Sequence, residues 1–220
     1  MINTIILGTT GMIGEGVLHK SLEHPYVESV LVINRQPCGV QHKKLKEIIH
    51  KDFFDLRPIK DQLSGYNACF FCLGVSSMGM NEGDYRNMTY NLTLNFAKTV
   101  IELNQDMTFT YVSGAGTDSS EKGRSMWARI KGKTENDLIK MPFKGAYAFR
   151  PGYIHPMPGM KNTLKPYKYL SFLYPVFKII FPAYVCTLSD IGTAMLEVCT
   201  EGYSKKVLEC KDITLLGNQK

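Results

Sequence analysis

The chain has 220 residues, of which 44% are apolar and 21% are charged, and its formal net charge is +6. This composition is typical of a globular protein and indicates one domain, 1–220, without a linker. The one dense basic cluster, 42–46, lacks interleaved aromatic residues, so we expect no nucleic-acid partner. The short apolar start has no basic leader, so we expect no secretory signal.

Six cysteines are present without the spacing of a disulfide framework, which predicts reduced thiols and a cytoplasmic protein. Cys69 and Cys72 have the spacing of a redox motif, but they lie in a predicted strand. Positions three apart in a strand face opposite ways, so packing is the better interpretation. The five histidines are scattered, and no metal site is predicted.

The first elements of the chain are a strand, a glycine turn and a helix. Ile2–Leu7 is an apolar run of strand length, and a helical pattern begins at Met12. Glycines at three-residue spacing join them, an arrangement that suits a dinucleotide pyrophosphate at a helix N-terminus. A tight turn without a ligand is the alternative. The candidate binding residues here are Gly8, Thr10, Gly11, Met12, Ile13 and Gly14.

The second strand, Ser29–Asn34, ends where a dinucleotide fold places the adenosine ribose. An acidic residue at this position would bind the ribose hydroxyls of NAD. The chain has Asn34 and Arg35 instead, and a guanidinium pairs well with a 2′-phosphate. We therefore expect NADP(H) as the cofactor, with an exposed loop arginine as the alternative interpretation.

The third strand is predicted at Leu45–His50, and Asp52 and Phe53 follow it. An aspartate at this place can accept a hydrogen bond from the adenine amino group while the backbone beside it contacts the ring. The alternative role is a helix cap, for which Asp55 is the better candidate because Leu56–Leu63 has a helical pattern.

The fourth strand, Asn67–Leu73, is almost continuously apolar, as a strand buried on both faces of a parallel sheet must be. Leu73 and Gly74 at its end are candidate cofactor contacts, because glycine allows the backbone to approach a ligand closely. A long helical pattern follows at Asp84–Leu103.

The remaining elements continue the alternation of strands and helices. The sequence predicts strands at Thr108–Ser113 and Gly145–Phe149 with a helix at Met126–Ile139 between them. Pro151 and Gly152 follow the last of these strands and are candidate cofactor contacts. Six such cycles without an internal repeat predict an α/β fold, a doubly wound parallel sheet of the Rossmann type.

The C-terminal part is predicted to form a small helical lid over the substrate end, 156–200. Within it, 167–185 is rich in aromatic and aliphatic residues but interrupted by prolines and a lysine, so no transmembrane segment is expected. A helix lying on a membrane surface is the alternative to a lid for 167–185. Ser189 or Asp190 is expected to cap a helix that runs to Cys199, and Lys206–Glu209 is expected to form a last short strand.

With these motifs in place, the chain resembles the atypical short-chain dehydrogenase/reductase superfamily, and within it the Tat-interacting-protein-like group of NADP-dependent oxidoreductases. The resemblance covers the chain to about Cys210. It is carried by Gly8–Gly14, Asn34–Arg35, Asp52–Phe53, Cys72–Gly74, Val112–Ser113, Lys131–Glu135 and Phe149–Gly152.

The resemblance implies that a tyrosine four residues before a lysine exchanges a proton with the substrate, helped by a serine. Lys131 occupies the lysine position and is expected to hold the nicotinamide ribose, but the residue four before it is Trp127. An indole N–H does not ionise at neutral pH, so the usual acid–base residue is missing. Ser113 is the candidate serine, with Gly114 or Ala115 at the matching position in another register.

Two functions of different classes remain open. One is an NADP-dependent oxidoreductase that acts on an unidentified small carbonyl or alcohol with a non-standard proton donor, with an epimerase-like enzyme as a weaker variant. The other is a non-catalytic NADPH-binding regulatory or interaction protein. The oligomeric state is not predicted. The conceivable substitute acids are Tyr85, Tyr90, Tyr153 and His155.

Overall fold

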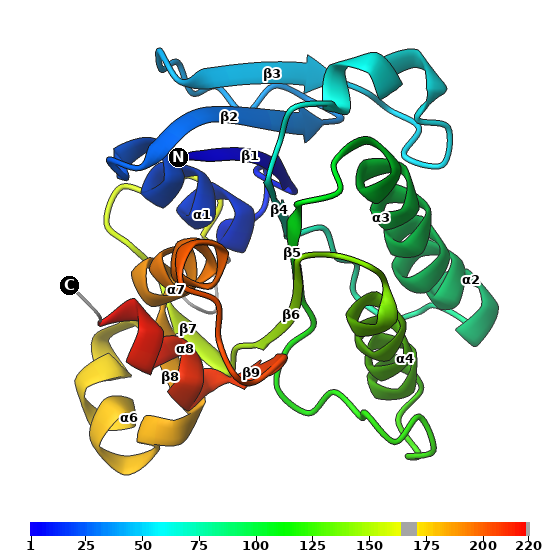
Figure 1. Ribbon diagram of the computed structural model, residues 1–220. Helices are drawn as coiled ribbons and strands as arrows, with labels where there is room; N and C mark the ends of the chain where they lie inside the picture. Colours follow the sequence, from blue (N-terminus) through cyan, green and yellow to red (C-terminus); the bar gives the residue numbers. More distant parts are fainter. Residues whose placement is uncertain (164–170, 219–220) are drawn as a thin grey trace.

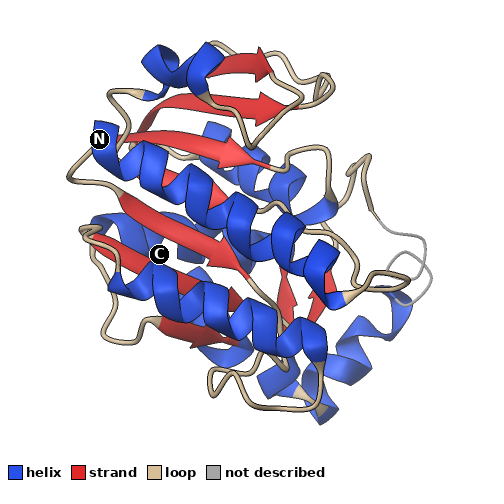
Figure 2. Ribbon diagram, turned by 90° about the vertical axis from the view of Figure 1, so that its right-hand side faces the viewer, coloured by secondary structure: helices blue, strands red, loops and turns tan. Residues whose placement is uncertain are grey.

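A seven-stranded parallel sheet forms the centre of the computed structural model, which describes residues 1–163 and 171–218. Its strand order is β3-β2-β1-β4-β5-β6-β9, and Figure 2 shows helices covering both of its faces. The α/β, doubly wound prediction is therefore confirmed. The strands are β1 (Ile2–Leu7), β2 (Val27–Asn34), β3 (Leu45–Ile49), β4 (Ala68–Phe71), β5 (Thr108–Val112), β6 (Gly145–Arg150) and β9 (Val207–Glu209).

The sheet reverses its order between β1 and β4, which pair with each other in the middle. The chain moves outward from β1 through β2 to β3 and then returns to β4, beside β1. Ligands of open α/β sheets bind beyond the carboxyl ends of the strands at such a switch point. The topology therefore places the loops after β1, β2, β3 and β4 at one candidate site.

Two hydrophobic cores lie on opposite faces of the sheet. One contains α1 (Met12–Glu23), α7 (Leu188–Thr200) and α8 (Cys210–Gly217), whereas the other contains α3 (Leu92–Leu103) and the 3₁₀ segment η1 (Arg57–Leu63). Figure 1 shows α4 (Met126–Lys140) beside α3 on the second face. Because both faces are covered, the central strands are apolar on both sides, as in the fully buried β4.

The long helix predicted before β5 has a π-helical segment in its middle. It consists of α2 (Glu82–Arg86), η2 (Asn87–Asn91) and α3. The short helix predicted at Leu56–Leu63 is the 3₁₀ helix η1, and Asp55 Oδ1 accepts a hydrogen bond from its first amide, Arg57 N, at 3.1 Å. The N-cap of η1 is Leu56 and not Asp55 as expected, and Asp55 precedes the cap while still accepting this hydrogen bond.

The C-terminal part differs from the predicted lid in one main respect. α7 packs against α1, and its Ile191, Ala194 and Met195 are completely buried, so it belongs to the body of the fold. Its cap is Thr187, with Asp190 as the reciprocal capping-box partner and not the cap itself. The predicted segment 167–185 falls partly outside the described residues, at 167–170.

Two short strands near this segment were not predicted. They are β7 (Tyr153–His155) and β8 (Val185–Thr187), which pair in a second, parallel sheet and are too short to show a periodic pattern. Between them lie η3 (Ser171–Leu173), α6 (Tyr174–Ile180) and η4 (Pro182–Tyr184). No helix in the described part of the chain has the length and apolar character needed to cross a membrane.

A buried ion pair fastens α4 to the sheet. Arg150, at the end of β6, forms a two-pronged contact with Glu135 of α4, whose side chain is fully buried, and its Nε lies 3.0 Å from Glu135 Oε1. Arg150 also donates to Glu209 Oε1 of β9 at 3.2 Å and to Ser119 Oγ of the β5–α4 loop at 2.5 Å. One guanidinium therefore connects two strands, a helix and a loop.

We expect Arg150→Met to lower the free energy of unfolding by about 3–5 kcal/mol, because it leaves the Glu135 carboxylate buried without a partner. Urea denaturation measures this loss. In a double variant with Glu135→Leu no buried charge remains, so much of the stability should return. A single variant as stable as the native protein would contradict this account.

Candidate functional site

The glycine loop between β1 and α1 turns tightly and approaches two other backbone segments. Gly8 has φ +82°, and a Cβ added to it would lie 2.7 Å from Cys72 O. A Cβ on Gly14 would overlap Gly8 O, whereas one on Gly11 would meet only Gly8 O, at 3.4 Å. Gly8 and Gly14 thus hold the loop together, and Gly11 and the adjacent Thr10 are exposed at the helix N-terminus.

Two of the residues predicted to contact a cofactor here have side chains that pack against the hydrophobic core. Met12 is buried in the core beneath the loop, and Ile13 is half-buried against the same cluster. Their backbone amides belong to the first turn of α1, where N–H groups have no partner within the helix. Such amides can bind an anion even though the side chains face the core.

The Asn34 side chain forms hydrogen bonds within the protein. Its side chain is 2% exposed, accepts a hydrogen bond from Thr9 Oγ1 at 2.9 Å and donates one to Glu47 Oε1 at 2.8 Å. Because both ends of the amide have partners, Asn34 links the glycine loop to β2 and β3. The side chain thus positions the loop, and the expected contact between Asn34 and a cofactor stays a prediction.

Arg35 lies in an open hollow of about 480 Å³ at the end of β2, which is also lined by Thr10, Gln36 and Lys51. Arg35 and Lys51 are exposed, and neither has an ion-pair partner among the described residues. Two cations with no internal partner and a loop residue at a helix N-terminus make this hollow suitable for an anionic group.

A second hollow of about 120 Å³ adjoins the first, because Arg35 and Lys51 line both. It lies between the ends of β3 and β4 and brings together four residues predicted to bind a cofactor: Asp52, Phe53, Leu73 and Gly74. Val75, Met88 and Leu92 give it an apolar side. Asp52 Oδ1 accepts a hydrogen bond from Phe54 N at 2.9 Å, which fixes the carboxylate at the rim.

Lys131 lies on α4 and reaches the end of β5, where its Nζ donates a hydrogen bond to Ser113 O at 2.5 Å. Burial lowers the pKa of Lys131 to about 8, and the Glu135 carboxylate one turn further along α4 opposes this shift. The ammonium is therefore held at the carboxyl edge of the sheet, with a pKa below that of an exposed lysine.

Trp127 occupies the helix turn before Lys131, and its ring lies over the β5–α4 loop. A Cβ on Gly116 would be 3.5 Å from the edge of the indole. The Ser113 hydroxyl is buried and donates to Phe149 O at 3.2 Å, so the structure does not present it to this space. Open space lies at Gly114, which has no side chain.

The four conceivable substitute acids have other contacts. Tyr85 is 1% exposed in the core, and Tyr90 donates to Asp137 Oδ2 at 2.8 Å on the outer side of α4. Tyr153 packs edge-on against Phe177. His155 stacks on Tyr174 with the ring centroids 4.0 Å apart, and burial lowers its pKa.

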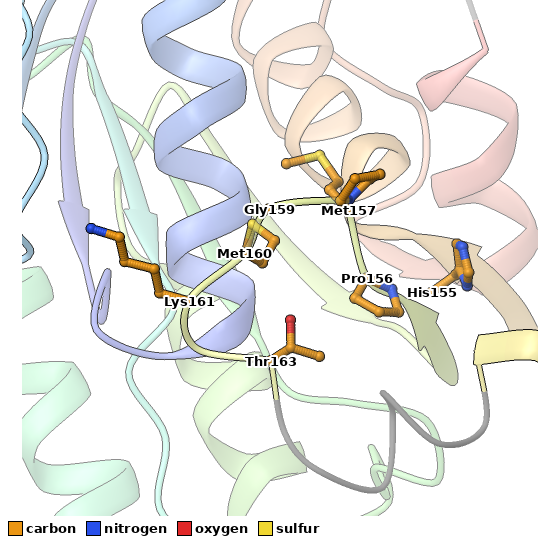
Figure 3. A pocket seen from close by; sticks show the side chains of 8 residues that line it. His155, Pro156, Met157, Gly159, Met160, Lys161 and Thr163 are labelled. Atoms are coloured by element: carbon orange, nitrogen blue, oxygen red, sulfur yellow. The ribbon is translucent and has the colours of Figure 1, made fainter.

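The loop after β7 is fastened to the start of α1. The Glu15 carboxylate is 4% exposed and accepts hydrogen bonds from Lys161 N at 2.8 Å and Asn162 N at 2.7 Å. The loop encloses a hollow of about 440 Å³. The residues that line it are His155, Pro156, Met157, Pro158, Gly159, Met160, Lys161 and Thr163. Figure 3 shows the Lys161 side chain extending away from those of Met157, Met160 and Thr163.

Pro151 and Gly152 connect β6 to this loop. Pro151 O accepts a hydrogen bond from Ala115 N at 2.9 Å, so it fixes the β5–α4 loop. A Cβ on Gly152 would overlap Tyr184 O, which shows that this glycine allows the C-terminal segment to approach the sheet. Both residues lie at the carboxyl edge, as predicted.

Sequence reasoning missed three residues that shape this edge: Glu15, Lys51 and Arg150. Lys51 had a usable signal, since it directly precedes Asp52 after a predicted strand. Glu15 had none, because its partner Lys161 is 146 positions away in the chain. Arg150 lies in the Phe149–Gly152 motif, but that motif did not indicate its partner Glu135.

No family model matches the chain. Curated relatives include protein FMP52, mitochondrial, of Meyerozyma guilliermondii, 26% identical over 152 residues, covering 68% of this chain and 64% of the relative. Protein fmp52-1, mitochondrial, of Aspergillus oryzae is 27% identical over 160 residues, covering 70% of this chain and 66% of the relative. The chain thus spans slightly less than two thirds of these relatives. Their names contradict the expectation of a cytoplasmic protein, which rested on cysteine usage alone.

The solved structures with similar folds include enzymes of two related kinds. Helicobacter pylori ADP-L-glycero-D-manno-heptose-6-epimerase has a TM-score of 0.69 at 15% identity, covering 94% of this chain and 75% of that one. The Bordetella bronchiseptica enzyme WbmF in complex with NAD+ has a TM-score of 0.67 at 13% identity, covering 99% and 77%.

A short-chain dehydrogenase/reductase of Saccharomyces cerevisiae has a TM-score of 0.65 at 11% identity, covering 93% of this chain and 92% of that one. At these identities the likeness establishes the fold. The particular likeness to the Tat-interacting-protein-like group stays a prediction. The chain has the Rossmann-type α/β fold that this epimerase, WbmF and the short-chain dehydrogenase/reductase share.

Proposed function

We propose that the protein binds NADP(H) and is an oxidoreductase acting on a small carbonyl or alcohol substrate. The observation that carries this proposal is the pair of adjoining hollows at the ends of β2, β3 and β4, with Arg35 and Lys51 where they meet. Their position at the switch point of the sheet, beside a glycine loop, is where a dinucleotide binds in this fold.

The glycine loop fits the pyrophosphate. Gly11 and Thr10 are exposed at the N-terminus of α1, and the open space at Gly11 leaves room for a phosphate close to the backbone. The smaller hollow, with Phe53 and Leu73 on its walls and Asp52 at its rim, suits an adenine ring. Arg35 and Lys51 then lie beside the adenosine ribose, and the neutral Asn34 replaces the carboxylate that NAD would favour.

NADP(H) supplies hydride transfer when bound, and the residues of the chain must supply the proton. Lys131 Nζ is assigned two tasks, donating hydrogen bonds to the nicotinamide ribose and giving up the proton that a carbonyl oxygen takes. The second assignment rests on its lowered pKa of about 8, and on the position of Trp127, which does not ionise. The indole forms one wall of the substrate space above Gly116.

The non-catalytic NADPH-binding protein is the second candidate function, and one observation favours it. The Ser113 hydroxyl is committed to Phe149 O, and a tryptophan stands where the tyrosine is expected, so both hydroxyl groups of the usual machinery are missing from the site. Cofactor affinity alone does not distinguish the candidates, but turnover does.

We expect NADPH to bind more tightly than NADH, and Arg35→Ala to remove most of the difference. Loss of a charge-assisted phosphate contact costs on the order of 1.5–3 kcal/mol, which is at least about tenfold in Kd. Isothermal titration calorimetry with both cofactors measures the change. Arg57→Ala is the matched control, because it removes an exposed arginine paired with Asp55, away from the hollows. Equal affinities in the native protein would refute the assignment of Arg35.

The glycine loop makes a separate prediction. We expect Gly11→Val to weaken NADPH binding severely while the unfolding midpoint stays near that of the native protein, because the added side chain meets little of the protein. Gly14→Val should instead lower the midpoint, since its Cβ overlaps Gly8 O. Calorimetry and thermal denaturation read these two properties independently. Unchanged affinity in Gly11→Val would make the loop a structural turn.

Turnover should depend on the protonated form of Lys131. We expect single-turnover oxidation of NADPH with a panel of small carbonyl compounds to be fastest below pH 8 and to slow as the pH rises through about 8, where Nζ loses its proton. Lys131→Arg should retain cofactor affinity but lose turnover, because a guanidinium does not give up a proton.

Lys131→Met should lose both affinity and turnover. NADPH that the native protein binds but never oxidises across the panel would favour the non-catalytic candidate. Turnover that is unchanged in Lys131→Arg would show that the proton comes from another group.

A further inference from the structure

Exposed apolar side chains gather in one stretch of the C-terminal part. Six of the thirteen exposed large apolar residues in the described part of the chain lie between 172 and 184. Ile179 is 81% exposed and Phe172 is 75% exposed, values that are unusual for such side chains. We call this group the apolar patch; it consists of Phe172, Val176, Ile179, Ile180, Phe181 and Tyr184.

Half of the patch, namely Val176, Ile179 and Ile180, lies on the helix α6, whose other side is already occupied. α6 has no buried residue and lies at the outer corner of the molecule (Figure 1). Its Tyr174 stacks on His155 and its Phe177 packs against Tyr153, so these two residues attach the helix to β7. Val176, Ile179 and Ile180 share the remaining face. A helix that is apolar all round normally has its second face covered.

The charged residues in the sequence around the patch are all lysines. The sequence from 156 to 189 contains four lysines, at 161, 165, 168 and 178, and no aspartate or glutamate. Lys178 is exposed on α6 itself, where its Nζ lies 5.9 Å from the centre of the Tyr174 ring. Aliphatic and aromatic side chains with the cationic Lys178 among them are complementary to a surface that is apolar inside and negatively charged outside.

We infer that the apolar patch docks the protein onto an anionic phospholipid bilayer, with α6 lying in the interface and Lys178 among the headgroups. The aromatic rings of Phe181 and Tyr184 suit the headgroup boundary, and the isoleucines suit the acyl region. A second copy of the chain fits less well, because a two-fold contact through α6 would bring Lys178 of both copies toward each other. This inference is independent of the proposed cofactor.

Co-flotation of the full chain with lipid vesicles tests the proposal. One set of vesicles is phosphatidylcholine alone, and the other is an equal mixture of phosphatidylcholine and phosphatidylglycerol, both at low salt. We expect the native protein to float with the mixed vesicles only. Ile179→Glu and Lys178→Glu should each reduce the bound fraction about tenfold, the first by placing a charge in the acyl region and the second by removing headgroup attraction.

Tyr26→Glu is the matched control, since Tyr26 is 62% exposed at the amino edge of the sheet and should leave vesicle binding unchanged. Thermal denaturation confirms that each variant is folded, and Phe172→Glu replaces Ile179→Glu if the latter is not. Absence from both vesicles, equal binding to both, or equal losses in Tyr26→Glu and Ile179→Glu would each overturn the proposal. A dimer in sedimentation equilibrium that Ile179→Glu dissolves would assign the patch to a second copy and would also overturn it.

Discussion

Close contact between backbone segments is the constraint on which this structure depends. Gly14 of α1 lies under Gly8 O, and Gly132 of α4 lies in the same way under Asp118 O, so a Cβ at either glycine would overlap the carbonyl. In each case a residue in the first two turns of a helix packs directly against the backbone of the loop that precedes the helix. Two loops from the two halves of the sheet are thereby fixed at the carboxyl edge. A site built on such loops is rigid without needing many side-chain contacts.

The sheet could be predicted because its strands carry their own signal. A strand such as Ala68–Phe71 is covered on both faces, so burial alone requires the apolar run that the sequence displays. α7 has the same apolar character; the sequence predicted it as part of a lid, whereas the structure packs it against α1. An apolar composition indicates that a helix is buried, but it does not indicate which surface of the protein the helix packs against. Thr187 was likewise missed as the cap because it belongs to β8, a strand of three residues with no pattern of its own.

The candidate site was predictable to the extent that its residues follow strands. Arg35, Asp52 and Gly74 each come shortly after a predicted strand, and parallel strands end at one edge, so the structure brings them together. What a side chain does at that edge depends on partners that are distant in the chain. The Asn34 side chain forms hydrogen bonds with Thr9 and Glu47, and the Ser113 hydroxyl donates one to Phe149 O. No local pattern in the sequence indicates these partners.

The ion pair of Arg150 with Glu135 links the stability of the fold to the chemistry proposed for α4. Glu135 lies one helical turn after Lys131, and its negative charge opposes the lowering of the Lys131 pKa by burial. Arg150 pairs with Glu135 through a two-pronged contact, which limits how far that carboxylate can raise the pKa of Lys131. A structural arginine at the end of β6 is thus linked through Glu135 to the surroundings of the ammonium at the end of β5. Because Trp127 cannot share a proton with it, Lys131 is the group at this position through which pH can act on the site.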